Sequence, residues 1–328
     1  MRILPPGAAT AAFAAIALTG QTAMAQTQWN LATAYQDENF HTQNIAMFAE
    51  DVAEMTDGAL VITLHTGASL LKMPEIKRGI QTGQVQAGEI LLSAYGAEDP
   101  FFEVDGIPFI SQGYLTAWKV YELTLPFISD RLESQGLMPL FSGPWPGQGL
   151  YAQKPIMSTS DYDGVKFRAY NALTARLAEL MGAIPTTVQS AEVPQAFATG
   201  VVSAMITSAA TGNYTKAWDF TSHYYDVSAM NNKNMVIANR EAFDALDPAV
   251  QDAVLAAAAK AEARGWIMSN HAQAETTGNL AANGMTVEAP SPELLAQLKA
   301  IGATMVEEWR AKAGEAGEAF LEAYSQLN

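Results

Sequence analysis

The sequence predicts an α/β fold divided into two lobes, and three observations support this prediction. Segments with the alternating pattern of strands take turns with segments that carry apolar residues at helical spacing. This order is typical of layered α/β folds with largely parallel sheets. The chain has 328 residues, and at about 100–200 residues per domain this length indicates two domains. Apolar residues make up 49% of the chain and charged residues 16%, which argues against disorder, a coiled coil or a collagen-like fibre.

Charge and cysteine content exclude several functions. Lys and Arg number 18 against 34 Asp and Glu, which gives a formal net charge of −16. So acidic a surface repels phosphate backbones, and nucleic-acid binding is therefore excluded. The sequence contains no cysteine, which removes disulfides, thiolate metal sites, cysteine nucleophiles and a lipidated-cysteine anchor. Stability must therefore come from packing.

The first 25 residues predict a secretory signal peptide. Arg2 gives a positive start, residues 7–19 form an Ala-rich apolar run, and residues 23–25 supply a small-x-small cleavage pattern. The apolar run is too short to span a bilayer as a helix. We expect cleavage after Ala25 and export of the mature chain to the periplasm. A disordered start or a membrane anchor is the alternative.

In the first half of the chain, residues 45–52 place apolar side chains at helical spacing before Gly58, where a helix would stop. Residues 60–65 then alternate in the period of a strand. The same analysis predicts strands at 29–35, 85–93 and 137–141, a short helix at 74–81, and a helix at 114–133 interrupted at Pro126.

The second half repeats this style. It predicts strands at 165–170 and 201–207 and helices at 172–181 and 191–199. Ligands of such folds bind at the carboxyl ends of strands, so the residues there are the first candidates for a site.

One helical segment is unusually long. The segment begins at Pro248 and runs to about Asn283. It has no proline after Pro248 and is rich in Ala, Glu and Lys. At 1.5 Å per residue it could reach roughly 50 Å, which is further than one small lobe is wide. We favour a continuous helix that braces both lobes. Two helices broken near Gly265 or Gly278 are the alternative.

The sequence offers no catalytic constellation. No two histidines have the spacing of a local metal pair, and we interpret each of them as a surface or capping group: His41, His65, His223 and His271. No GxSxG motif is present. Residues 143–149 lack the Lys-Ser/Thr ending of a phosphate loop and are interpreted as a rigid crossing between lobes. Acidic residues such as Glu89, Glu98 and Asp99 are interpreted as members of solvated loops. We therefore expect no enzyme, no metal site and no cofactor.

One strand suggests capture of a small molecule. The period of two places Lys166, Arg168 and Tyr170 on one face of the strand at 165–170. An arginine near the carboxyl end of a strand can present its planar fork to a carboxylate. A structural ion pair with a neighbouring Asp is the alternative for Arg168.

The residues then resemble a known family. Residues 161–208, DYDGVKFRAYNALTARLAELMGAIPTTVQSAEVPQAFATGVVSAMITS, resemble the DctP-type solute-binding proteins of tripartite ATP-independent periplasmic (TRAP) transporters. Supporting segments are GASLLKMPEIKRGIQTGQVQAG at 67–88, FFEVDGIPFI at 101–110 and FDALDPAVQDAV at 243–254. The resemblance covers essentially the whole mature chain.

The resemblance implies a two-lobed α/β periplasmic binding protein fold, braced by the long helix. Lobe I would comprise residues 26–148 and 237–282, and lobe II residues 149–236 and 283–328. It also implies a monomer that captures an organic acid, performs no chemistry on it and delivers it to the small and large permease subunits in the membrane. The carboxylate-binding arginine of the family corresponds to Arg168.

Two departures from the family pattern bear on the ligand. Many members carry a second arginine in a W-x-x-G-x-R segment, whereas here Trp145 and Gly149 are followed by Tyr151 near the expected position. Where many members close a later strand with Asn, this chain has Thr207-Ser208. Burying many ligand hydroxyls without partners costs about 1–3 kcal/mol each. We therefore expect a monocarboxylate, with aromatic and keto acids as candidates, and disfavour a sugar acid.

Further candidate binding residues follow from the strand ends and from family position, although each one could equally be a core aromatic or a loop polar group. They are Tyr35, Asn39, Phe40, Ser69, Ser93, Tyr95, Trp145, Gln148, Tyr151, Tyr170, Met205, Thr207, Ser208, Thr211, Asn213 and Trp218. We expect closure of the lobes around the ligand, with hinges near 143–149 and 235–239. A ligand-presenting partner of a membrane sensor and an exported lyase or isomerase are the alternative functions.

Overall fold

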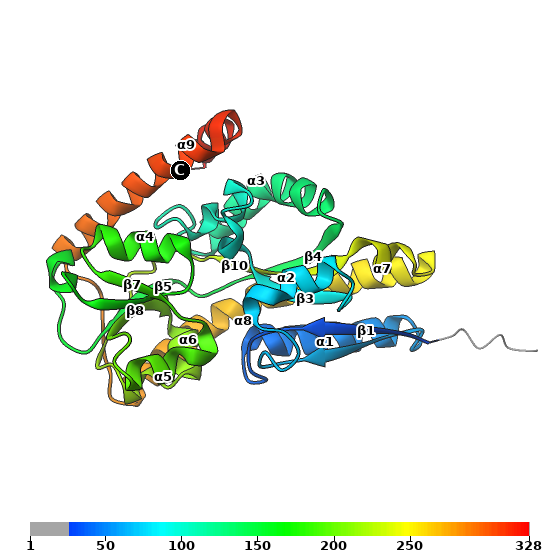
Figure 1. Cartoon of the computed structure of the whole chain (residues 1–328), viewed down its shortest axis with the longest axis horizontal. Helices are drawn as coiled ribbons and strands as arrows, with labels where there is room; N and C mark the ends of the chain where they lie inside the picture. The colour runs from blue at the N-terminus through cyan, green and yellow to red at the C-terminus, as the bar shows by residue number, and fades with distance from the viewer. Residues whose placement is uncertain (1–25, 328) are drawn as a thin grey trace, which may run out of the picture.

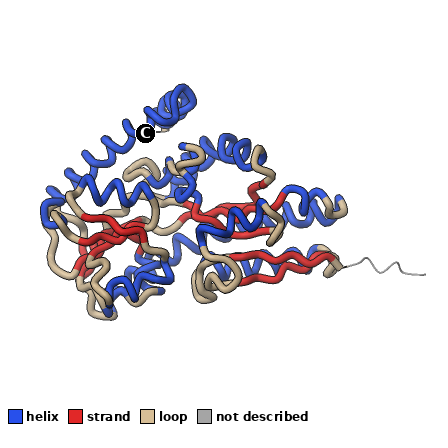
Figure 2. Tube along the Cα trace, viewed as in Figure 1, coloured by secondary structure: helices blue, strands red, loops and turns tan. Residues whose placement is uncertain are grey.

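The structure is a computed structural model that describes residues 26–327, so the predicted signal peptide lies outside the described residues. The strands form two separate sheets with helices packed around each (Figures 1 and 2). The predicted two-lobed α/β architecture is confirmed. Between residues 26 and 327, no helix combines the length and the apolar sequence that crossing a bilayer requires.

The first sheet has five strands in the spatial order β2-β1-β3-β10-β4. Their bounds are β1 Thr27–Ala32, β2 Leu60–His65, β3 Ala87–Leu91, β4 Leu137–Pro144 and β10 Lys233–Asn239. Strand β1 pairs in parallel with β2 and β3, whereas β10 pairs antiparallel with β3 and β4. The helices of this half are α1 Phe40–Met55, α2 Met73–Gln81, α3 Tyr114–Glu133 and α7 Arg240–Asp244. Pro126 lies inside α3 without ending it, so the predicted interruption is wrong.

The second sheet has six strands in the order β11-β9-β5-β8-β6-β7. Their bounds are β5 Gln148–Ala152, β6 Lys166–Ala169, β7 Ile184–Thr187, β8 Ala204–Ser208, β9 His223–Tyr225 and β11 Thr286–Glu288. The helices are α4 Ala172–Leu180, α5 Val193–Ala198 and α6 Ala209–Tyr214. Strand β6 lies between β7 and β8 and runs parallel to both, which directs the carboxyl ends of all three to one edge.

The chain crosses between the sheets at two segments. The first crossing joins β4, which ends at Pro144, to β5, which begins at Gln148, and this confirms the predicted crossing at 143–149. The second joins β9 to β10 through residues 226–232. The predicted hinge at 235–239 is wrong, because those residues pair on both sides inside the first sheet. The expected lobe boundary at residue 237 likewise falls inside β10.

Two long helices connect the halves. Helix α8 spans Pro248–Ala282 as one helix of 35 residues, which confirms the brace and rules out two broken helices. It packs on α1 and β4 of the first half and on α6 and β11 of the second (Figure 1). Gly265 does not break it but permits close packing, since a Cβ there would lie 2.8 Å from Asn44 Nδ2. Helix α9, Pro292–Ser325, kinks at Gly314 and packs on α3 and α4.

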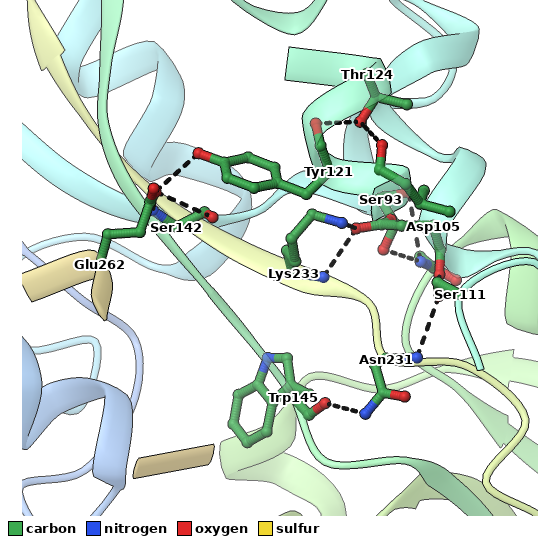
Figure 3. A network of polar contacts seen from close by, with 12 residues as sticks. Ser93, Asp105, Ser111, Tyr121, Thr124, Ser142, Trp145, Asn231, Lys233 and Glu262 are labelled. Carbon is green, nitrogen blue, oxygen red and sulfur yellow. Dashed lines mark hydrogen bonds and ion pairs between the residues drawn. The ribbon is translucent and has the colours of Figure 1, made fainter. Parts of the chain in front are cut away.

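A buried ion pair fixes the start of β10. Lys233 Nζ lies 2.7 Å from Asp105 Oδ2, and both side chains are at most 3% exposed. The backbone N–H of Lys233 donates to the same carboxylate oxygen, at 3.0 Å. Asn231, in the second crossing, donates from Nδ2 to the carbonyl of Trp145 in the first (3.0 Å; Figure 3). The two crossings are therefore joined to each other and to the segment that carries Asp105.

We expect Lys233→Met to lower the free energy of unfolding by about 3–5 kcal/mol, because it leaves a buried carboxylate without its counter-charge. Urea unfolding measures this. The double variant Lys233→Met with Asp105→Asn should recover at least half of the loss, since no charge is then buried alone. Arg240→Met, which breaks an exposed pair with Asp244, should cost less than about 1 kcal/mol. Equal losses in the single and double variants would contradict this account.

Candidate functional site

A cavity lies between the two sheets, with an empty volume of about 420 Å³. The first half contributes side chains from the ends of β1 and β3 and from α2. The second half contributes side chains from the ends of β6, β7 and β8 and from α6, and the crossings contribute the rest. The lining residues are Tyr35, Met73, Leu91, Trp145, Gln148, Arg168, Tyr170, Gln189, Ser190, Thr207, Thr211 and Asn232.

Arg168 is the one cation among these lining residues. It lies in β6, which follows a turn at Gly164 with φ 69°, and its side chain is 2% exposed. Its Nε donates to the carbonyl of Val188 at 2.9 Å, and its guanidinium carbon lies 5.2 Å from the ring centre of Tyr170. Arg168 Nη1 is buried and has no hydrogen-bond partner within residues 26–327.

No described carboxylate forms an ion pair with Arg168, so the structural ion pair considered from the sequence is not found. Burial lowers the pKa of this guanidinium to about 10, which leaves it charged at neutral pH. A buried cation without a counter-charge is costly to the fold. The arrangement can therefore bind an anion through charge-assisted hydrogen bonds.

Other polar groups of the cavity can form hydrogen bonds with the uncharged part of a ligand. The hydroxyl of Tyr170 and Oδ1 of Asn232 are buried and have no hydrogen-bond partner among the described residues. Gln148 uses Nε2 to donate to the carbonyl of Pro146 at 2.9 Å. The cavity thus offers Asn232 Oδ1 as an acceptor and the hydroxyl of Tyr170 as a donor or acceptor.

Aromatic rings form the wall opposite Arg168. Trp145 packs edge-on against Tyr35 and Phe40, with ring centres 5.1 and 5.5 Å apart, and its ring lies 4.6 Å from that of His41. We call Trp145, Tyr35 and Phe40 the aromatic wall. Only Trp145 and Tyr35 of the three line the cavity itself.

Behind this wall lie two ionisable groups that the sequence analysis misplaced. Glu89, expected in a solvated loop, is 1% exposed in β3, and His41, expected at the surface, is 5% exposed. Glu89 Oε1 lies 3.6 Å from His41 Nδ1. Burial raises the pKa of Glu89 to about 7 and lowers that of His41 to about 3. Glu89 is buried because β3 lies between β1 and β10 inside the first sheet. His41 is buried because its ring, in the first turn of α1, packs on Phe40 and Trp145.

The structure brings together seven of the residues that the sequence indicated. They are Tyr35, Trp145, Gln148, Arg168, Tyr170, Thr207 and Thr211. Most of them lie at strand ends or in the first crossing, as the topology predicted.

Tyr151 and Met205 do not line this cavity. They pair across β5 and β8 and pack in a buried hydrophobic cluster with Val188 and Phe197. The hydroxyl of Tyr151 donates to the carbonyl of Ser208 at 3.1 Å. Many family members carry a second arginine near the position of Tyr151. In this chain Tyr151 does not line the cavity in its place.

The remaining candidates also lie outside the lining, and most have structural partners. Asn39 and Ser208 cap α1 and α6. Ser93 accepts from Asn171 Nδ2 at 2.9 Å, a contact between the halves. Ser69 is exposed on a turn, Tyr95 packs on Lys77, Phe40 packs behind Trp145, Asn213 lines a separate hollow, and Trp218 borders a hydrophobic cluster.

Five lining residues were missed: Met73, Leu91, Gln189, Ser190 and Asn232. Gln189 and Ser190 directly follow β7, so the rule of strand ends could have found them once that strand was assigned. Asn232 lies in the second crossing, which the sequence pattern did not reveal.

Comparisons with known proteins agree with this geometry. A family model described as bacterial extracellular solute-binding protein, family 7 (DctP), matches residues 31–312. Two solved Bordetella pertussis structures are similar, both described as extracytoplasmic solute receptors binding pyroglutamic acid. DctP6 is 46% identical, with a TM-score of 0.90 over 92% of this chain and 100% of that chain. DctP7 is 48% identical, with a TM-score of 0.90 over 91% of this chain and 99% of that chain.

Curated relatives match over a shorter stretch. The C4-dicarboxylate-binding periplasmic protein DctP of Rhodobacter capsulatus is 29% identical over 163 residues, which is 48% of each chain. The chain thus spans about half the length of the curated relatives that it matches.

The buried pair of His41 and Glu89 predicts opposite pH responses in two variants. The ordinary pKa values of Glu and His are 4.5 and 6.5. Between these two pH values the folded pair holds one proton, on Glu89. The unfolded pair also holds one proton, on His41. Its contribution to stability is then flat with pH. In Glu89→Gln the native state holds none and the unfolded state one, so stability should fall by about 1.4 kcal/mol per pH unit as pH drops.

His41→Gln should show the reverse slope over the same range. There the native state keeps the proton on Glu89 and the unfolded state has none, so stability falls as pH rises. Urea unfolding at pH 4.5 and 6.5 measures both slopes. Parallel profiles in the two variants would show that the pair does not share a proton in this way.

Proposed function

The chain belongs to family 7 of the bacterial extracellular solute-binding proteins, the DctP family, and from this membership we propose that it is the solute receptor of a TRAP transporter. In this role it captures an organic acid outside the cytoplasm and delivers it to the small and large membrane subunits of a permease. Export requires the signal peptide, with cleavage after Ala25. No observation on the described residues favours a sensor partner, a lyase or an isomerase.

Arg168 carries the proposal. A guanidinium that is 2% exposed, with Nη1 unpartnered inside a cavity between two lobes, supports a site for a carboxylate. The ligand would supply the counter-charge that no described residue provides. Arg168 is therefore proposed as the residue that selects acids.

We propose pyroglutamate as the ligand. The two relatives that are 46% and 48% identical are described as binding pyroglutamic acid. Pyroglutamate is a small monocarboxylate whose ring amide adds one donor and one acceptor. Its carboxylate suits Arg168, and its ring N–H suits the buried Oδ1 of Asn232. This ligand keeps the expected single carboxylate, whereas the aromatic and keto acids considered from the sequence become weaker candidates.

Binding would be coupled to closure of the lobes. Contacts already join the halves in this structure: the backbone N–H of Phe40 donates to the hydroxyl of Tyr214 at 3.2 Å, and Asn171 donates to Ser93. A ligand held by Arg168 and touched by Tyr35 would bind the closed form better and raise its population. The sequence analysis divided the lobes into 26–148 with 237–282 and 149–236 with 283–328. We propose the same division, except that the boundary expected at residue 237 lies in the crossing at 226–232.

We expect Arg168→Met to weaken pyroglutamate binding by more than about 100-fold, because the ligand carboxylate then lacks its buried partner. The ligand-free variant should be at least as stable as the wild type, since an apolar side chain replaces a buried unpaired charge. Isothermal titration calorimetry and urea unfolding measure the two effects.

Arg176→Met is the matched control. Arg176 is more than a third exposed and pairs with Glu308 at 2.7 Å, away from the cavity. This variant should bind normally. Normal binding by Arg168→Met would remove the central residue of the proposal.

Wild-type protein should be stabilised by pyroglutamate in a thermal-shift screen of organic acids. A ligand at 100 times its Kd adds about 2.7 kcal/mol of stability, which such a screen detects readily. Proline, which has the ring and carboxylate but lacks the ring carbonyl, should give a smaller shift. Stabilisation by a sugar acid and not by pyroglutamate would contradict the proposed ligand.

A further inference from the structure

A chain of hydrogen bonds connects the aromatic wall to Glu89. Trp145 Nε1 donates to Asn234 Oδ1 at 2.9 Å, and Asn234 Nδ2 donates to Glu89 Oε1 at 2.7 Å. Trp145 lines the ligand cavity, whereas Asn234 and Glu89 lie behind it. All three side chains are at most 5% exposed.

The chemistry of each group fixes the direction of this chain. An indole N–H can only donate, so the Asn234 amide must turn its oxygen to Trp145 and its nitrogen to Glu89. The nitrogen then needs an acceptor, and a carboxylate supplies one. An apolar residue at position 89 would leave that amide nitrogen buried and unpaired.

A second arm leaves Glu89 on its other oxygen. The hydroxyl of Thr33 donates to Glu89 Oε2 at 2.5 Å, and the backbone N–H of Tyr35 donates to the Thr33 oxygen at 3.3 Å. Tyr35 lines the cavity beside Trp145 and packs edge-on against it. One buried carboxylate therefore holds both residues that the aromatic wall presents to the cavity.

Packing does not surround the two side chains that hold the indole on every side. A second cavity with an empty volume of about 210 Å³ lies behind the wall, lined in part by His41, Glu89, Asn234 and Gly143. The Nε2 of His41 is buried there without a hydrogen-bond partner among the described residues. Asn234 and Glu89 thus border free space, so their orientation depends on the hydrogen bonds that they make to each other and to Trp145.

We propose that Glu89 is a positioning residue for ligand binding: it touches no ligand, and it orients Trp145 and Tyr35 through Asn234 and Thr33. This inference rests on the proposed function of the cavity for its effect on affinity, but not for its effect on the indole. It assigns to the carboxylate of β3 a role in setting the shape of the pocket opposite Arg168.

The test combines calorimetry with pyroglutamate and NMR of the indole N–H signals in ligand-free protein. The signal of Trp145 is assigned by its loss in Trp145→Phe. Glu89→Leu should shift or broaden this signal and weaken binding by about 10- to 100-fold. Glu89→Gln keeps an oxygen acceptor for Asn234 and should retain the signal and bind within about 3-fold of the wild type.

Two variants keep the test decisive if Glu89→Leu does not fold. Asn234→Leu removes the acceptor of the Trp145 indole, together with a side-chain contact to Tyr35, and should move the Trp145 signal. Thr33→Val breaks only the arm to Tyr35 and should weaken binding with a smaller shift of the indole signal.

Glu262→Leu is the matched control. Glu262 is a half-buried carboxylate that also accepts several hydrogen bonds, from the hydroxyl of Tyr121 (2.8 Å) and from the backbone N–H (2.9 Å) and hydroxyl (3.4 Å) of Ser142. It should lose stability while keeping the Trp145 signal and the affinity. An unmoved Trp145 signal in folded Glu89→Leu or Asn234→Leu overturns the inference, and so does an equal loss of affinity in Glu262→Leu.

The two proposals fail separately. If wild-type protein does not bind pyroglutamate but the indole signal moves as expected, the proposed ligand is wrong and the positioning of Trp145 stands. If wild-type protein binds and no variant moves the signal, the proposed ligand stands and the positioning role is wrong.

Discussion

The structure depends on a guanidinium that is buried without a carboxylate beside it. Arg168 obtains only a carbonyl and an aromatic ring from the described part of the chain. These partners hold the side chain in place but do not neutralise it. A buried unpaired charge destabilises a fold, so its retention points to a partner from outside the chain. The rest of the fold holds this group between the two halves.

The buried pair of Lys233 and Asp105 presents the opposite case. There a cation and an anion lie 2.7 Å apart and neutralise each other's charge, so that pair calls for no counter-ion. It ties β10 to the segment that precedes α3, while Asn231 joins the two crossings. Helix α8 also packs on both halves, so the halves are joined by the crossings and by this helix. The molecule thus combines one paired cation that fixes the crossings with one unpaired cation that can respond to an anion.

The sequence predicted those features that depend on local order. The alternation at 165–170 placed Arg168 and Tyr170 together, and the absence of proline from 249–283 favoured one long helix; both hold in the structure. The family resemblance is confirmed as well. Glu89 was misjudged because its burial depends on β10, a strand more than 140 residues later that inserts between β3 and β4. Tyr151 and Met205 were misjudged for a different reason. The alternation of a strand predicts which of its two faces a side chain lies on, but it does not predict how far along the sheet the cavity extends.

The same long-range insertion has a consequence for specificity. Strand β10 carries Asn234 beside Glu89, and the crossing just before it carries Asn232 into the cavity. The first crossing carries Trp145, whose indole bonds to Asn234. Both crossings therefore present side chains to the cavity while they join the lobes. A rotation of one lobe about these segments would move the aromatic wall and Asn232 relative to Arg168. Under the proposed function the same residues would respond to ligand shape and to lobe closure. A ligand that fits Arg168 but not the wall would then bind without stabilising the closed form.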